Sequence, residues 1–244
     1  MATTTEEPLK HHPKRSRRAA TASLVALLAY LAAAYVAAPE FWWIHDGRLR
    51  GEDMRTTTTD GIPGDPINVG LVGVRNDVLQ AFAAAGWRPA DAITLKTSIE
   101  IGLSVVLHEP DPDAPVSTLV YDGRRQDLAF EKPVGDSADQ RHHVRLWQTD
   151  PIAPGAQGPL WLAAASFDRG VGVSHDTGQI THHIGPDLDA ERDFVVSNLS
   201  EDGWVRSTYE IEGAGATKTG RNGGGDPYFT DGKVLVGVLG KPAE

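Results

Sequence analysis

The sequence predicts an α+β fold, a mainly antiparallel sheet with helices packed on one face, preceded by a single N-terminal transmembrane helix. Three observations predict it. The first is an uncharged apolar stretch, the second is a series of short alternating segments separated by Gly, Pro and Asp turns, and the third is a pair of segments with helical spacing that each end in Gly-Trp. With 244 residues and 40% hydrophobic content, the chain can bury a sizeable core.

The apolar stretch AATASLVALLAYLAAAYVAA, residues 19–38, contains no charged residue and no proline. As a helix it spans about 30 Å, the thickness of the hydrocarbon core of a bilayer. Phe41, Trp42 and Trp43 follow it, and aromatic residues are typical of the membrane interface. Residues 19–43 are therefore predicted to cross the membrane.

Residues 1–18 form a basic tail in front of this segment. The positive-inside rule places such a tail in the cytoplasm, so we expect a single-pass protein of the cytoplasmic (inner) membrane with its C-terminal domain outside. The flanking charges disfavour a buried helix of a soluble protein. A cleaved signal peptide is the other alternative. Pro39 directly after Ala38 disfavours it, as does an apolar run longer than the roughly 7–15 residues of a signal core.

The remainder of the chain divides into a predicted linker at 44–66, which is polar and rich in Gly and Pro, and a predicted domain at 67–244. Apolar residues at helical spacing predict helices at 75–87, 94–107 and 189–204. Alternating apolar residues predict strands at 67–74, 117–123, 126–134, 142–149, 160–174, 180–184, 205–213 and 233–240. The glycine-rich residues 213–227 are predicted to be a flexible loop, and they lack the spacing of a phosphate-binding loop.

Two of the predicted helices resemble each other. When Trp87 is aligned with Trp204, the residues Arg75, Val78, Leu79, Phe82 and Gly86 fall on Arg192, Val195, Val196, Leu199 and Gly203. Two strand-helix units in one sandwich would give this pattern. The spacing that all amphipathic helices share would give it too.

Charge and cysteine content exclude several classes of function. The formal net charge is -10, and the chain after the basic tail is more acidic still, so nucleic acid is not an expected partner. There are no cysteines, which excludes disulfides, thiol nucleophiles and Cys-ligated zinc.

Several motifs occur together in one order: GDPINVGLVG, AFAAAGWRPAD, QDLAFEKPVG, RHHVRLW, WLAAASFDRGVGVS and TGQITHHIGPDLDAERDF. Over roughly residues 64–211 the chain resembles the LssY C-terminal domain family of bacterial envelope proteins. The resemblance implies attachment to the membrane, here through residues 19–43. It also implies envelope or secretion proteins as partners, and it carries no established catalytic mechanism.

The histidine pairs are the predicted metal ligands. Neighbouring residues of a strand point to opposite faces, so the pairs His142-His143 and His182-His183 each offer one imidazole to each side of a sheet. If the two strands pair in register, one histidine of each pair converges on one face, and Asp168, Asp187 or Asp189 completes a site for Zn, Fe or Mn. Packed or solvated histidines without a metal are the alternative.

The other candidates are charged residues near these pairs. Asp168 and Arg169 precede a Gly-Val-Gly stretch, and with Arg192 they are the candidate catalytic groups; a surface ion pair is the alternative for the first two. Arg141, Arg145 and Asp189 are the candidate ligand-binding residues. Asp187 and Asp189 also suit the cap of the helix that follows. Arg192 suits a helix start poorly, so we expect it to pair with Asp168 or to face a ligand.

Two functions follow from these candidates. The favoured hypothesis is an accessory domain that one helix holds outside the membrane and that binds a ligand or partner through its His/Asp/Arg face. The alternative is a metal-dependent hydrolase of phosphoester or lipid-linked substrates, in which metal-bound water is the nucleophile. Whether the chain is an enzyme stays open between the two.

Overall fold

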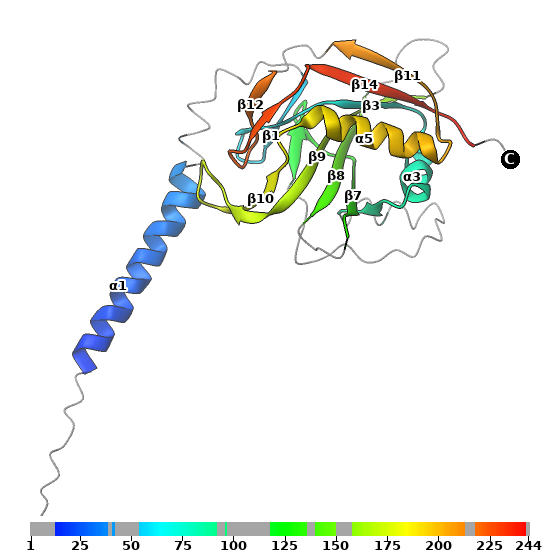
Figure 1. Cartoon of the computed structure of the whole chain (residues 1–244). Helices are drawn as coiled ribbons and strands as arrows, with labels where there is room; N and C mark the ends of the chain where they lie inside the picture. Colours follow the sequence, from blue (N-terminus) through cyan, green and yellow to red (C-terminus); the bar gives the residue numbers. More distant parts are fainter. Residues whose placement is uncertain are drawn as a thin grey trace, which may run out of the picture.

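The structure is a computed structural model that describes residues 13–38, 41, 54–91, 96, 118–135, 140–149, 158–212 and 218–242. Helix α1, Pro13–Ala32, continues into one π-helical turn, η1, Ala33–Ala37, and projects away from the body of the molecule (Figure 1). Within the described residues, Arg18–Ala37 is the one helix that is long and apolar enough to cross a membrane. This confirms the predicted apolar N-terminal helix, whose length and composition suit a membrane anchor and a signal sequence alike.

The body is built on an eight-stranded sheet. Its strands lie in the order β11-β14-β3-β9-β8-β7-β4, and β10 pairs with the second half of the long strand β9. All neighbours are antiparallel except β14 and β3, so the mainly antiparallel sheet is confirmed. The strands are β3 Val69–Val72, β4 Arg88–Pro89, β7 Leu128–Pro133, β8 Arg141–Gln148, β9 Leu160–Val173, β10 Ile180–Ile184, β11 Val205–Glu212 and β14 Lys233–Leu239.

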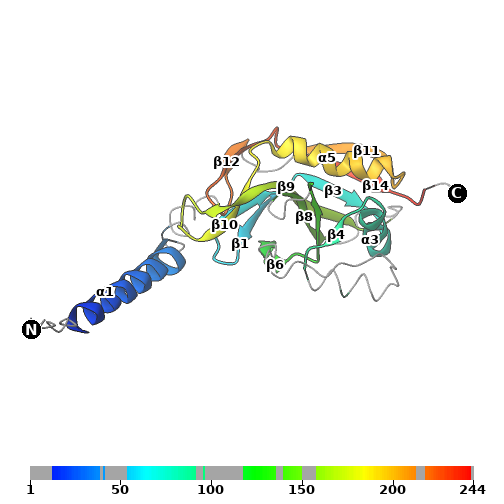
Figure 2. The ribbon, with the colours of Figure 1, turned by 60° about the horizontal axis from the view of Figure 1, so that its bottom comes forward.

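Helices α3, Arg75–Ala84, and α5, Leu188–Glu201, cover one face of this sheet (Figure 2). Their apolar residues join Trp161, Ala163 and Ala165 of β9 in the largest core cluster. Because side chains alternate along a strand, the intervening residues of β9 lie on the opposite face of the sheet. The buried polar residues of the sheet lie mainly on that face.

The two helices end in the same way, as their sequence similarity suggests. Gly86 and Gly203 both have a left-handed backbone, with φ of 75° and 74°, which glycine adopts without the steric cost that a Cβ adds. The amide of the following tryptophan then donates to a carbonyl five residues back, from Trp87 to Phe82 and from Trp204 to Leu199. The predicted helix at 94–107 lies outside the described residues, apart from Lys96.

A second sheet packs on the opposite face, in the order β2-β1-β5-β6. Its strands are β1 Arg55–Thr58, β2 Pro63–Pro66, β5 Leu119–Tyr121 and β6 Arg124–Arg125, and Leu119 joins Trp147, Leu162 and Ala164 in a second core cluster. The prediction of a linker is therefore wrong for residues 55–66. Two short strands of threonine, glycine and proline lack apolar alternation, and it is pairing with the distant β5 that orders them.

The glycine-rich stretch also differs from its prediction. Residues 218–227, predicted as part of a flexible loop, contain β12, Thr219–Arg221, which forms a hairpin with β13, Pro227–Phe229. The side-chain oxygen of Asn222 accepts hydrogen bonds from the amides of Gly224 and Asp226, at 3.0 and 2.9 Å, so the turn is held from within. Residues 213–217 lie outside the described part of the chain.

Candidate functional site

Strand β8 places a row of charged residues on the face of the sheet opposite the helices. Arg141, His143 and Arg145 share this face with Trp147, and each is at most 5% exposed. The neighbouring strand brings Asp168 and Ser166 opposite Arg141 and His143. Charged groups are buried in proteins only when they are paired, so the contacts among these residues determine what the face can do.

Asp168 links Arg141 to His143. Its Oδ2 accepts from Nε of Arg141 at 2.9 Å, and its Oδ1 lies 3.0 Å from Nδ1 of His143. Arg141 also donates to Oε2 of Glu131 at 2.8 Å. Burial alone would raise the pKa of Asp168, but the contacts with His143 and Arg141 outweigh it and hold the pKa well below its usual range. Asp168 is therefore an anion that stabilises the cluster.

Ser166 and His143 have the distances of a nucleophile and its base, with 2.8 Å between Oγ and Nε2. The arrangement does not make Ser166 a nucleophile. Ser166 is fully buried and does not line the cavity, and its hydroxyl donates to Oδ2 of Asp65 at 3.1 Å, so it is not placed to attack a substrate there. A buried polar network thus runs through Asp168, His143, Ser166 and Asp65.

Arg145 is a second buried arginine of this face, 5% exposed. Burial lowers its pKa, and the nearby carboxylates of Asp65 and Asp168 partly oppose that effect. Its Nη1 lies 3.7 Å from Oδ2 of Asp65. A guanidinium in such a position is a strong partner for a further oxyanion, because the low dielectric around it strengthens the attraction.

A cavity of about 220 Å³ opens above this row. Its walls include the ionisable groups Asp60, Asp65, Arg141, His143, Arg145 and Asp168. Hydroxyl and amide groups complete much of the remaining lining; they belong to Thr58, Thr59, Thr118, Ser174, Thr177, Gln179, Thr181 and Asn222. The small sheet, the β9–β10 hairpin and the β12–β13 hairpin thus meet around a polar cavity whose deep end is charged.

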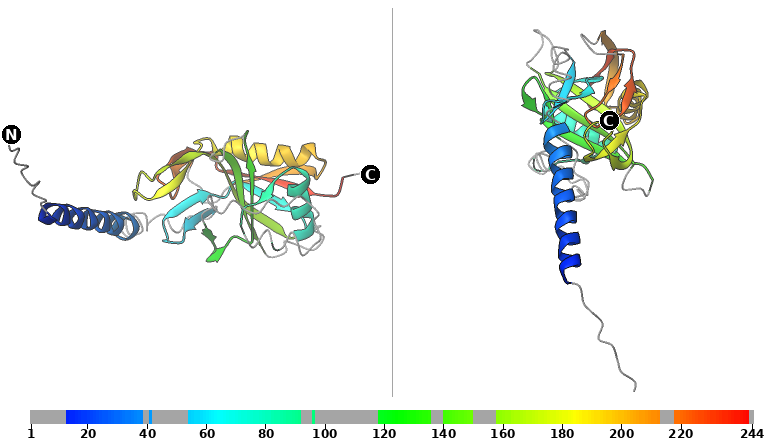
Figure 3. Two further views of the ribbon diagram at one scale, coloured as in Figure 1. Left: turned by 90° about the horizontal axis from the view of Figure 1, so that it is seen from below. Right: turned by 90° about the vertical axis from the view of Figure 1, so that its left-hand side faces the viewer.

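The cavity lies beside the end of the apolar helix. Thr177 and Gln179 line it, and in the same hairpin turn Nε2 of Gln179 donates to the carbonyl of Ala34 at 3.0 Å. The hydroxyl of Tyr30 donates to the carbonyl of Gly178 at 2.7 Å. Figure 3 shows the β9–β10 hairpin at this junction from two directions. The helix that could cross a membrane therefore ends against one wall of the cavity.

The two histidine pairs are divided between the faces, but their strands do not pair with each other, because β9 lies between them. His143 and His182 both line the cavity. His142 lies on the helix face, where its Nδ1 is 2.8 Å from Oε2 of Glu191 and its ring stacks on Phe194. His183 contacts Asp226, with 2.7 Å between Nδ1 and Oδ1. The histidines thus occupy three separate environments.

The acidic run at the start of α5 is mainly structural. Asp187 is the N-cap, and its side chain accepts from the amide of Ala190 at 3.0 Å, as expected for capping. Asp189 accepts from Thr230 at 2.7 Å and from the amide of Asp231 at 2.8 Å. Neither residue lines the cavity.

Two of the candidate catalytic residues also lie outside the cavity lining. Arg169 is exposed, and Arg192 bonds to Asp189, Asp193 and Asp231, so its expected pairing with Asp168 is wrong. Burial would lower the pKa of Arg192, but hydrogen bonds to Asp193 and Asp231 raise it above its usual value. The three acidic neighbours explain why a cation is stable at this helix start.

Sequence reasoning missed Asp65 and Asp226. Asp65 falls in the segment predicted as a linker, and only the pairing of β2 with β1 brings it to the cavity. Asp226 follows three glycines and precedes a proline, a position that signals a tight turn and an acidic residue held within it.

Comparison of the sequence with known proteins identifies one matching family. A family model described as LssY C-terminus matches residues 48–234, which is most of the chain. The match includes β1, β2 and the β12–β13 hairpin, and so covers every wall of the cavity. No curated protein and no solved structure matches the sequence significantly.

Proposed function

Because the chain belongs to the LssY C-terminus family, we propose that it is a single-pass membrane-anchored protein of the bacterial cell envelope whose domain binds an anionic lipid headgroup in the cavity. The N-terminus lies inside and the domain lies outside the cytoplasmic membrane. The observation that carries the proposal is the position of Arg141 and Arg145, two buried guanidinium groups on the wall of a cavity at the end of the apolar helix.

The charges of the cavity favour an oxyanion as the ligand. Arginine presents its N–H donors in a fork that matches phosphate and carboxylate oxygens. Asp168 is already engaged by Arg141 and His143, and Asp65 accepts from Ser166 and lies 3.7 Å from Arg145, so the two buried carboxylates of the wall have partners within the protein. Asp60, the third carboxylate of the wall, is exposed to solvent. The threonine and serine hydroxyls of the rim suit the polar part of a headgroup.

The position of the cavity favours a lipid as the source of that oxyanion. If residues 19–38 span the bilayer, Tyr30 and Ala34 lie in the outer part of the span, so the hairpin that they contact lies at the membrane interface. Val171 and Val173 of this hairpin are exposed, at 50% and 56%, which suits contact with the interface. A cavity of about 220 Å³ holds a headgroup while the acyl chains stay in the bilayer.

The alternative, a hydrolase that uses a metal held by the cavity histidines, has less support. Nε2 and Nδ1 of His143 already face Ser166 and Asp168 at 2.8 and 3.0 Å. His142 and Asp187, two of the predicted ligands, contact Glu191 and Ala190 outside the cavity. These contacts favour a binding site over a catalytic one.

Calorimetric titration of the full chain in uncharged detergent micelles tests the proposal. We expect dihexanoylphosphatidic acid to bind with about one equivalent, and Arg145→Met to weaken binding by about tenfold or more, because a hydrogen bond to a charged group contributes about 1.5–3 kcal/mol. Arg169→Met is the matched control. It removes an exposed arginine from β9, outside the cavity, and should leave the affinity unchanged.

Two further ligands identify the source of the oxyanion. Dihexanoylglycerol, which lacks the phosphate, should not bind, and inorganic phosphate should bind more weakly than the lipid. Equal affinity for inorganic phosphate and the lipid would contradict a lipid ligand. Absence of binding to the unsubstituted protein, or equal weakening by both arginine substitutions, would contradict the site.

A further inference from the structure

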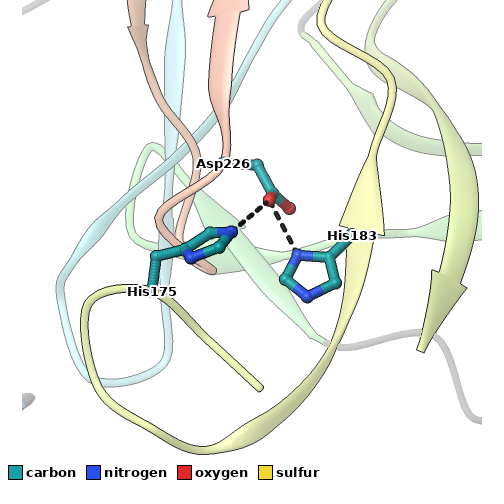
Figure 4. Close-up of side chains that lie close together, drawn as sticks. All are labelled: His175, His183 and Asp226. Atoms are coloured by element: carbon teal, nitrogen blue, oxygen red, sulfur yellow. Dashed lines mark hydrogen bonds and ion pairs between the residues drawn. The ribbon is translucent and has the colours of Figure 1, made fainter. Parts of the chain in front are cut away.

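A second polar cluster lies next to the cavity but outside its lining. His175 in the β9–β10 turn, His183 on β10 and Asp226 before β13 come from three segments and converge (Figure 4). One ligand atom of each lies within 4.8 Å of the other two, and among the described residues they form a group with the composition of a metal site. We propose that these three residues bind a divalent transition metal ion such as Zn²⁺.

Asp226 is the fixed member of this site. It is 1% exposed, and its Oδ2 accepts from the amide of Ile184 at 3.0 Å, which leaves Oδ1 directed at the histidines. Oδ1 lies 2.7 Å from Nδ1 of His183 and 3.6 Å from Nε2 of His175. A buried carboxylate with one oxygen held by the backbone and the other facing two imidazoles is oriented as a ligand.

The ring of His183 is oriented by a glycine. A Cβ at position 172 would clash with Nε2 of His183, so only glycine leaves room for the ring in this position. With Nε2 packed against Gly172, Nδ1 is the nitrogen that faces Asp226. The side chain of His175 is 64% exposed and can adjust to an ion, and its ring centroid lies 5.0 Å from that of His183.

The ligand set identifies the class of metal. Two imidazole nitrogens and one carboxylate oxygen suit Zn²⁺ and related ions, whereas Mg²⁺ and Ca²⁺ prefer oxygen ligands alone. Binding displaces the proton that His183 shares with Asp226, and three protein ligands leave a coordination position for water. Among the sequence candidates only His183 belongs to this site. The proposal is independent of the lipid ligand.

A bound ion would hold together the walls of the cavity. Ser174 precedes His175, and the two residues contact Gly224 through the Ser174 hydroxyl at 2.9 Å and the His175 amide at 3.1 Å. Ser174 and Gly224 both line the cavity. Metal at this site therefore ties the turn beside the apolar helix to the β12–β13 hairpin.

Metal titration of the untagged full chain in micelles tests this inference. We expect one equivalent of Zn²⁺ to bind in competition with a chromophoric chelator, and Co²⁺ to give the visible absorption of a four-coordinate ion. His175→Ala should weaken binding by more than about tenfold, since even residues that only orient a ligand contribute about 10–100-fold. Because His175 is exposed, this variant should fold, as circular dichroism would show.

Two control variants separate this site from the other histidines. His182→Ala removes the neighbour of His183 that lines the cavity, and His11→Ala/His12→Ala removes the pair in the basic tail. Both should bind Zn²⁺ as the unsubstituted chain does. The proposal is overturned if the unsubstituted chain binds no Zn²⁺, if His175→Ala retains its affinity, or if either control loses the ion.

Discussion

Asp168→Asn is expected to lower the free energy of unfolding by about 3–5 kcal/mol, the cost of removing one partner from a buried ion pair. Asp168 is 2% exposed and contacts both Arg141 and His143. The asparagine keeps the shape but removes the charge, so both partners stay buried with less compensation. Urea unfolding of the full chain in micelles, followed by tryptophan fluorescence, measures the difference.

Asp193→Asn is the matched control for this substitution. Asp193 also contacts an arginine, at 2.9 Å from Nε of Arg192, but its side chain is 57% exposed. An exposed pair contributes less than about 1 kcal/mol because water and salt screen it. If the two substitutions lowered the free energy of unfolding equally, Asp168 would not be a buried ion-pair partner of Arg141 and His143.

The difference in stability between the unsubstituted chain and Asp168→Asn should depend on pH. The folded state holds the pKa of Asp168 below that of an unfolded aspartate, which is about 3.9. The stability that this carboxylate contributes is therefore fully present above about pH 4 and is lost as the pH falls toward the folded-state pKa. The unfolding difference between the unsubstituted chain and Asp168→Asn should be constant near neutral pH and shrink below about pH 4. A difference that grows in acid would contradict the assigned direction.

Trp147→Ala is expected to cost about 3–5 kcal/mol of unfolding free energy, the range for removing a large aromatic residue from a core. Trp147 is fully buried between the two sheets, and its ring lies 5.9 Å from that of Tyr121 on β5. Its Nε1 donates to the carbonyl of Arg124 at 3.0 Å, which ties β6 to the main sheet. Urea unfolding again measures the loss.

Trp147→Phe separates packing from the hydrogen bond. It keeps most of the apolar contact and loses the indole N–H, so we expect it to cost less than the alanine variant and to leave the carbonyl of Arg124 without this donor. A cost below about 1 kcal/mol for Trp147→Ala would mean that the small sheet does not pack on the main sheet, and that residues 55–66 are a linker after all.

The elements that could be predicted from the sequence are those that residues within the element itself specify. Helix α3 follows from apolar spacing and from Gly86 at its end, and the bounds of β10 agree with the prediction at both ends. Strands β1, β2, β12 and β13 are short and rich in Thr, Gly or Pro, and distant partners order them, so no local pattern reveals them.

In the candidate site, too, local features could be predicted and long-range contacts could not. Alternation along a strand correctly separates His142 from His143, but it does not reveal that β9 lies between the two histidine pairs. The contacts of Asp65 with Ser166, and of Asp226 with His183, join residues far apart in the chain. The poor fit of a cation to a helix start predicts a partner for Arg192, but it does not identify Asp231, which lies on a later segment that the sequence does not place.

The proximity of the cavity to the membrane is the central claim, and site-specific quenching tests it most directly. The chain has no cysteine, so Val173→Cys in the β9–β10 hairpin and Tyr209→Cys on β11 each accept one fluorescent label. Both native side chains are exposed, and β11 lies at the opposite end of the body from α1 (Figure 1). The full chain is reconstituted into phosphatidylcholine vesicles that carry a nitroxide on some headgroups. We predict strong quenching at position 173 and little at position 209; equal quenching at the two positions, or none at position 173, would contradict a cavity that opens at the membrane surface.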